Sequence, residues 1–126
     1  MSNSDERPRV AIGHVILGSP DVGASTEFLL RAGLRMIEAG ETVSVLELRG
    51  GTHLIVVPSG APVAAGAKAG FDLMVDDIEA THKIYAELEL DPSDLEPGEF
   101  HTSFKIVEPG GHEITVNSSH ASDLPV

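Results

Sequence analysis

Two stretches of this 126-residue sequence repeat one another. Residues 13–17 align with residues 69–73 at an offset of 56 (69 − 13 = 56), and the alignment continues without a gap. It places Asp21 on Asp77, with apolar residues in matching positions after each aspartate. A repeat of this kind is typical of one supersecondary unit used twice, where neither copy can bury its apolar face alone. We therefore expect two similar units that share a core.

An amphipathic helix is predicted after each of these aspartates. Apolar and small residues recur at intervals near three and four, which places them along one face of a helix. Asp21 and Asp77 stand at the N-cap positions, where a carboxylate accepts a free backbone N–H of the first turn. Gly33 marks the end of the first helix. The residues that form the apolar faces are Val22, Ser25, Phe28, Leu29 and Ala32 in the first copy and Ile78, Thr81, Ile84, Tyr85 and Leu88 in the second.

Short strand-like segments follow each predicted helix. Glycine pairs and the sequence Glu108-Pro109-Gly110-Gly111 separate them, because these residues favour tight turns. Residues 90–99 should hold one further short strand, although proline and acidic residues interrupt it. The other predicted strands after the helices are residues 34–38, 42–48 and 52–57 in the first copy and residues 100–107 and 112–117 in the second.

Each copy thus reads as a strand, a helix and three strands, which predicts an α+β fold of two tandem βαβββ modules. The chain is long enough for one core but too short for two independent ones, so we expect a single domain. The predicted boundaries are a disordered tail over residues 1–9, module one over 10–58, a linker over 59–68, module two over 69–119 and a second tail over 120–126.

Three motifs, in the order found here, resemble those of one superfamily. They are Ile12-Gly13-His14-Val15-Ile16-Leu17, Gly70-Phe71-Asp72-Leu73-Met74-Val75-Asp76-Asp77, and Glu108-Pro109-Gly110-Gly111-His112-Glu113-Ile114-Thr115-Val116. The chain resembles the vicinal oxygen chelate superfamily, which includes glyoxalase I, bleomycin and fosfomycin resistance proteins and extradiol dioxygenases. The resemblance implies a cupped mixed sheet of eight strands with the helices outside, a homodimer, and often one divalent metal in each cavity. The fold does not choose among these activities.

The resemblance also implies four strand positions for the ligands of a metal. A divalent ion needs several nitrogen or oxygen donors that converge on one point. The four positions hold His14, Ile55, Gly70 and Thr115, so only the first keeps a strong donor. A shift of two residues keeps the same strand face, and a displaced site could then use His14, His53, Asp72 or Glu113. Loss of the metal is the simpler interpretation, and we predict no metal.

The face of the sheet that carries His14 should then hold a small molecule. Strand alternation places polar side chains on it from both modules, with Asp72 and Lys105 able to form an ion pair that offsets the cost of burying each charge. The alternative is that Lys105 or His14 holds a substrate carboxylate or carbonyl. The predicted binding residues are His14, His53, Asp72, Lys105, Ser103 and Thr115.

The net charge of −12, from 20 acidic and 8 basic residues, argues against a nucleic-acid partner. A well-solvated surface is the simpler explanation of this charge, and the alternative is that it favours a cationic ligand over an anionic one. With no cysteine and no long apolar segment, we expect a cytoplasmic protein without a membrane partner. The leading hypothesis is a small-molecule-binding protein without a functional metal. The alternative is a metal-dependent lyase, isomerase or dioxygenase of the glyoxalase type, using Zn, Ni, Mn or Fe around His14. A third is metal-independent acid–base catalysis by His14, His53 or Lys105, so whether the chain is an enzyme stays open.

Overall fold

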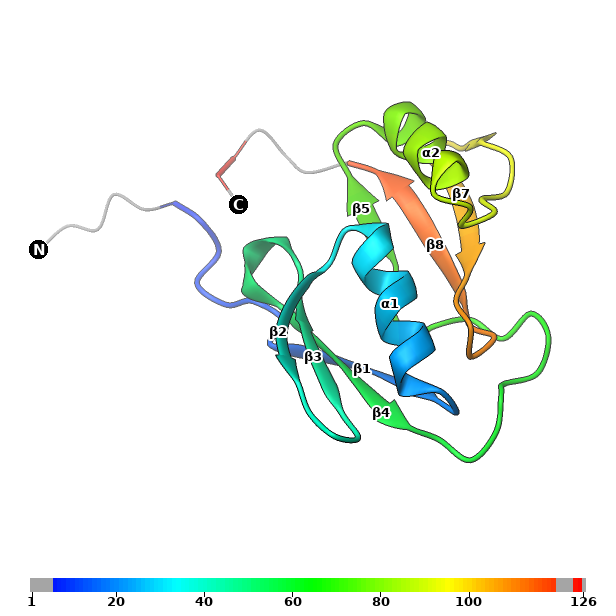
Figure 1. Ribbon diagram of the computed structural model, residues 1–126. Helices are drawn as coiled ribbons and strands as arrows, with labels where there is room; N and C mark the ends of the chain where they lie inside the picture. The colour runs from blue at the N-terminus through cyan, green and yellow to red at the C-terminus, as the bar shows by residue number, and fades with distance from the viewer. Residues whose placement is uncertain (1–5, 120–123, 126) are drawn as a thin grey trace, which may run out of the picture.

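A computed structural model describes residues 6–119 and 124–125 of the chain (Figure 1). The predicted order of elements is confirmed in both halves. Module one contains β1 (His14–Ser19), α1 (Val22–Ala32), β2 (Arg35–Ala39), β3 (Ser44–Glu47) and β4 (His53–Pro58), with a short 3-10 turn at Arg49–Gly51. Module two contains β5 (Leu73–Val75), α2 (Ile78–Glu87), β6 (Glu96–Pro97), β7 (Thr102–Val107) and β8 (Glu113–Ser118). The strand expected within residues 90–99 is the two-residue β6.

The two helices begin in the same way. The Asp21 carboxylate accepts a hydrogen bond from the Ala24 backbone N–H at 3.0 Å, and the Asp77 carboxylate accepts one from Ala80 at 3.0 Å. Both aspartates therefore cap their helices as the repeat predicts. Helix α1 ends at Gly33, whose φ of 117° lies in the left-handed region that glycine adopts without steric cost.

The eight strands form two four-stranded mixed sheets, with the strand orders β1-β4-β3-β2 and β5-β8-β7-β6. In each sheet the first and last strands of the module pair in parallel, and the other pairs are antiparallel. The predicted α+β class with two tandem βαβββ modules is confirmed, and the eight strands are divided between two sheets that do not close into a barrel. Within residues 6–119 and 124–125, neither helix is long and apolar enough to cross a membrane.

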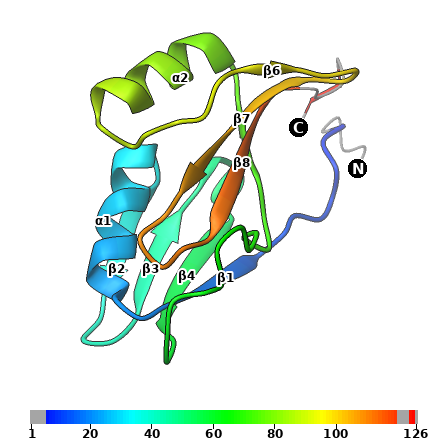
Figure 2. The same cartoon turned by 90° about the vertical axis from the view of Figure 1, so that its right-hand side faces the viewer.

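One hydrophobic core joins the modules, as expected for units that cannot bury their apolar faces alone. It combines Leu17, Phe28 and Leu54 of module one with Phe104 and Ile114 of module two, among others. Helices α1 and α2 meet along one side of the molecule (Figure 2). There the Arg31 guanidinium donates a hydrogen bond to the Leu88 carbonyl at 2.9 Å, and the Tyr85 hydroxyl donates one to the carbonyl of Ala32.

A buried carboxylate also links the modules. Glu108, in the turn between β7 and β8, is 1% exposed and accepts a hydrogen bond from the Ser25 hydroxyl of α1 at 2.6 Å. It also accepts bonds from the backbone N–H groups of Gly110 and His112 and lies 2.8 Å from the His112 ring. Burial raises the pKa of Glu108, but the bonds from Ser25, His112 and Gly110 outweigh it and leave the pKa below its usual value. The carboxylate is therefore ionised and fully hydrogen-bonded inside the protein.

Candidate functional site

The face of the module-one sheet that lies opposite α1 carries a line of four polar residues, one from each strand. Strand register places Arg35 of β2 opposite Glu47 of β3, Glu47 opposite His53 of β4, and His53 opposite His14 of β1. We call these four residues the polar row. They share a face because the neighbouring residues Val15, Leu46 and Leu54 turn toward the core, and successive side chains in a strand point to opposite faces.

Hydrogen bonds connect three members of the polar row. His53 Nε2 lies 3.0 Å from a Glu47 carboxylate oxygen, and the Arg35 guanidinium donates to the other oxygen. These contacts, first with Arg35 and then with His53, hold the pKa of Glu47 below its usual value. The imidazole of His14 stands edge-on to that of His53, with ring centroids 6.0 Å apart. The predicted pair His14 and His53 is therefore together on one face.

A second line on the same face is apolar. Val45 precedes Glu47 by two residues on β3, while Ile55 and Ile16 follow His53 and His14 by two residues on β4 and β1. The three lie opposite one another in register. We call these three residues the apolar row. Ile16 is 64% exposed, although it belongs to a strand whose other face is in the core. Polar and apolar groups thus lie side by side on this sheet face, the combination that small-molecule sites use for orientation and for binding energy.

The corresponding face of the module-two sheet carries the other predicted residues. Lys105 of β7 lies opposite Thr115 of β8, and Ser103 lies opposite Asn117. Asp72 precedes β5 on the other side of β8. The residues that gather here, which we call the module-two cluster, are Asp72, Ser103, Lys105, Glu113, Thr115 and Asn117.

Asp72 and Lys105, which strand alternation allowed to form an ion pair, have other partners instead. Asp72 accepts a hydrogen bond from the Asn117 side-chain amide at 2.6 Å, and the Lys105 ammonium lies 3.6 Å from a Glu113 oxygen. The reason is strand order, since β5 and β7 flank β8 on opposite sides and β8 separates the two charges. Each charge finds its partner on β8 itself.

Among the described residues, two hollows can be compared with these faces. One, with a volume of about 380 Å³, is lined by His82, Ala86, Glu89, Asp91 and Pro92. The other, of about 460 Å³, is lined by Gly33, Arg35, Glu47, Leu48, Arg49, Gly50 and Gly51, so it adjoins the polar row. Each is built from one module only. Neither brings the polar row and the module-two cluster into a shared cavity.

The donors available do not fit a metal ion within one chain. In the part of the chain that the structure describes, no three His, Asp or Glu side chains are grouped so as to hold one. Of the displaced set, His53 is engaged by Glu47, while Asp72 and Glu113 belong to the other sheet and contact Asn117 and Lys105. A metal needs several donors that converge on one point.

Sequence reasoning missed Arg35 and Glu47, the two members of the polar row on β2 and β3. A signal for Glu47 was present, because it alternates with the apolar residues Leu46 and Leu48 and must point away from the core. No such signal marked Arg35, since all five residues of β2 are exposed and show no alternation. Its position follows from the register between β2 and β3, which the sequence does not state.

No protein-family model and no curated protein matches the sequence. Solved structures do match the fold. A lactoylglutathione lyase from Agrobacterium tumefaciens aligns with a TM-score of 0.73 and 20% identity, over 90% of this chain and 97% of its own. A bleomycin-binding protein in complex with bleomycin gives a TM-score of 0.70 and 17% identity, over 87% of this chain and 98% of its own.

The fosfomycin resistance protein FosX from Mesorhizobium loti gives a TM-score of 0.67 and 16% identity, over 90% of this chain and 94% of its own. These similarities extend over nearly the whole of each chain, and at such identities they concern the fold. The chain therefore has the fold of glyoxalase and bleomycin resistance proteins, the fold that its sequence motifs predict.

Proposed function

We propose that this protein binds a small organic molecule on the sheet faces opposite the helices. The predicted binding residues are His14 and His53 in module one and Asp72, Ser103, Lys105 and Thr115 in module two. The observation that carries the proposal is the placement of the polar row beside the apolar row on one face. The relatives in fold include a bleomycin-binding protein solved with its ligand, which supports the same class of function.

The proposed binding requires no metal. Its support is the state of the available donors, because His53, Asp72 and Glu113 each contact another side chain. The second candidate is a metal-dependent lyase, isomerase or dioxygenase of the glyoxalase type. The observation in its favour is the adjacency of two imidazoles, His14 and His53, on neighbouring strands.

Metal analysis separates these two candidates. The metal content of purified protein would be measured, and thermal unfolding would be followed with added Zn, Ni, Mn or Fe(II). A bound ion at 100 times its dissociation constant stabilises the folded state by about 2.7 kcal/mol. We expect no stoichiometric metal and no rise in melting temperature. Near-stoichiometric metal with a clear rise would contradict the proposal and favour the second candidate, and His14→Ala should then abolish metal binding.

We further propose that the protein is a homodimer. The support is the apolar surface left on the strands, where Ile16 is 64%, Met74 50% and Val107 56% exposed. Large apolar side chains left exposed on strands are more stable when a partner covers them. Light scattering after size-exclusion chromatography should give twice the chain mass. Met74→Glu, which lies outside the apolar row, should shift the protein toward a monomer, whereas Ile84→Glu on α2 should not.

A ligand screen completes the test. Small organic cations come first, because the net charge of −12 favours them at long range. Binding would be read from backbone NMR shifts. Shifts confined to β1, β4, β7 and β8 would support the proposal. Ligand shifts confined to the hollow beside α2, which His82 and Glu89 line, would contradict it.

A further inference from the structure

The contact between Glu47 and His53 fixes which imidazole nitrogen carries hydrogen. An ionised carboxylate can only accept hydrogen bonds, and Glu47 lies 3.0 Å from Nε2 of His53. The hydrogen must therefore be on Nε2 for this contact to be favourable. Arg35 holds the same carboxylate from its other oxygen, which keeps Glu47 in place across the sheet.

The opposite ring nitrogen of His53 is then an acceptor. In a neutral imidazole one nitrogen donates and the other accepts, so Nδ1 carries the lone pair. No hydrogen-bond partner for Nδ1 is found among residues 6–119 and 124–125. About a third of the His53 side chain is exposed, at 32%. The acceptor is thus accessible from the sheet face.

We propose that Arg35 and Glu47 orient His53 as a hydrogen-bond acceptor, and that this face selects small molecules with an O–H or N–H donor next to an apolar body. This inference rests on the proposed function and specifies the class of ligand. Glu47 is a positioning residue in it, because it acts on the ligand only through the imidazole.

The apolar row supplies the second half of the selectivity. Two residues along a strand correspond to roughly 6.6 Å, so Val45, Ile55 and Ile16 begin about one aromatic ring's width from the polar row. A ring that rests on Ile16 and Ile55 would bring a substituent to the level of His53. A hydroxyl substituent would donate to Nδ1, whereas a group with no hydrogen to donate would leave that acceptor unpaired, at a cost in affinity.

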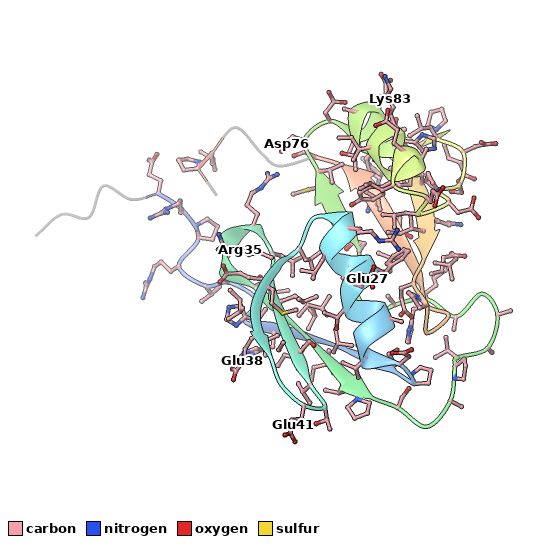
Figure 3. All side chains as sticks on the ribbon, viewed as in Figure 1. Glu27, Arg35, Glu38, Glu41, Asp76 and Lys83 are labelled. Atoms are coloured by element: carbon pink, nitrogen blue, oxygen red, sulfur yellow. The ribbon has the colours of Figure 1, made fainter. Side chains whose placement is uncertain are left out.

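The tautomer of His53 is the first test. Nitrogen-15 NMR of labelled histidines would be recorded at pH 8.5, about two units above the ordinary imidazole value of about 6.5. We expect the Nε2–H form for His53. In Glu47→Gln the population of this form should fall, because the amide can donate to Nε2. The matched control is Glu41→Gln, which removes the same charge at the far end of the β2–β3 hairpin from Arg35 (Figure 3). An Nδ1–H form in the unaltered protein would overturn the inference.

Paired probes give the second test. Phenol and anisole have the same ring, but only phenol can donate a hydrogen bond. We expect phenol to shift the His53 ring signals and anisole to bind about five- to tenfold more weakly. In Glu47→Gln the preference for phenol should shrink, while in Glu41→Gln it should stay.

The outcomes separate the inference from the proposed function. Equal binding of phenol and anisole on the strands would overturn the donor selectivity and leave the proposed function standing. Binding of neither compound would also overturn the inference, and the ligand screen would then decide the proposed function independently.

Discussion

The two modules share one plan, yet they use their helices differently. Five residues of α1 are buried, Ser25, Thr26, Phe28, Leu29 and Ala32, whereas only Ile78 and Tyr85 are buried in α2. The caps at Asp21 and Asp77 have the same geometry, so the difference does not arise in the helices themselves. Helix α1 packs on its own sheet and also contacts the Glu108 turn and the end of α2. The repeated sequence pattern therefore specifies that a helix forms in each module. The position of each helix relative to the other module decides how many of its residues are buried.

The sheets differ as well. The strands of module one contain four to six residues, whereas β5 has three and β6 has two. In module one, hydrogen bonds connect residues from three strands into the polar row. In module two, the charges of Asp72 and Lys105 are each paired with a residue of β8. His53 of module one is held in place with one ring nitrogen left open, while Asp72 and Lys105 of module two each already have a partner.

The largest expected effect compares two residues that the repeat aligns. Phe28 is 6% exposed and its counterpart Ile84 is 51% exposed. Phe28→Ala should lower the free energy of unfolding by about 3 to 5 kcal/mol, because it leaves a cavity between the modules. Ile84→Ala should change it by less than about 0.5 kcal/mol. Urea unfolding of both variants measures the contrast, and equal losses would show that the modules use their helices alike.

A second pair of aligned residues, Ser25 and Thr81, tests the hydrogen bond between Ser25 and Glu108 that connects the two modules. Ser25→Ala removes one donor from the buried Glu108 carboxylate and should cost about 1.5 to 3 kcal/mol. At the aligned position, the Thr81 hydroxyl donates only to the Asp77 carbonyl within its own helix, and it is exposed. Thr81→Ala should therefore cost less than about 0.5 kcal/mol. A small loss for Ser25→Ala would mean that the modules do not depend on this contact.

Low pH should weaken the contacts of the buried Glu108 carboxylate, because protonation removes its charge. Because the pKa of folded Glu108 lies below its usual value, its ionised form stabilises the protein above about pH 4.3, the ordinary value for a glutamate. This stabilisation is lost as the pH falls through the folded value. Glu108→Gln should be less stable at pH 7 and should lose less stability between pH 5 and pH 3. The urea midpoints of both proteins across this range measure it, and parallel curves would contradict the expectation.

The smallest expected effect should be equal in the two modules. Asp21→Ala and Asp77→Ala each remove one cap, at a cost of about 1 kcal/mol. Equal losses in urea unfolding would support the view that the modules share their local structure and differ in packing. A clearly larger loss for Asp21→Ala would locate part of the difference in the caps.

The sequence was sufficient to predict the features that depend on residues close together in the chain. Both caps, both helices and the turn at Glu108 follow from residues close together in the chain, and alternation placed His14 and His53 on one face. What could not be predicted depends on contacts between distant residues. The partners of Asp72 and Lys105 follow from strand order, and Ser25 meets Glu108 across 83 residues. The sequence could not indicate Arg35, because all five residues of the edge strand β2 are exposed and none of them alternates with a buried residue.

The domain boundaries at residues 58–59 and 68–69 stay predictions, and residues 1–5, 120–123 and 126 of the predicted tails lie outside the described residues.

The parallel pairing of the first and last strands has a consequence for synthesis of the chain. His14 pairs with His53 across 39 residues (53 − 14), and Leu73 pairs with Val116 across 43 (116 − 73). Neither sheet can therefore close until the last strand of its module has left the ribosome. Such long closures slow folding, since chain entropy is lost before the contacts form. Module one completes its strands first, and the core that it shares with module two stays uncovered until β8 has formed. We therefore expect the chain to be most prone to aggregation between the synthesis of residue 58 and that of residue 118.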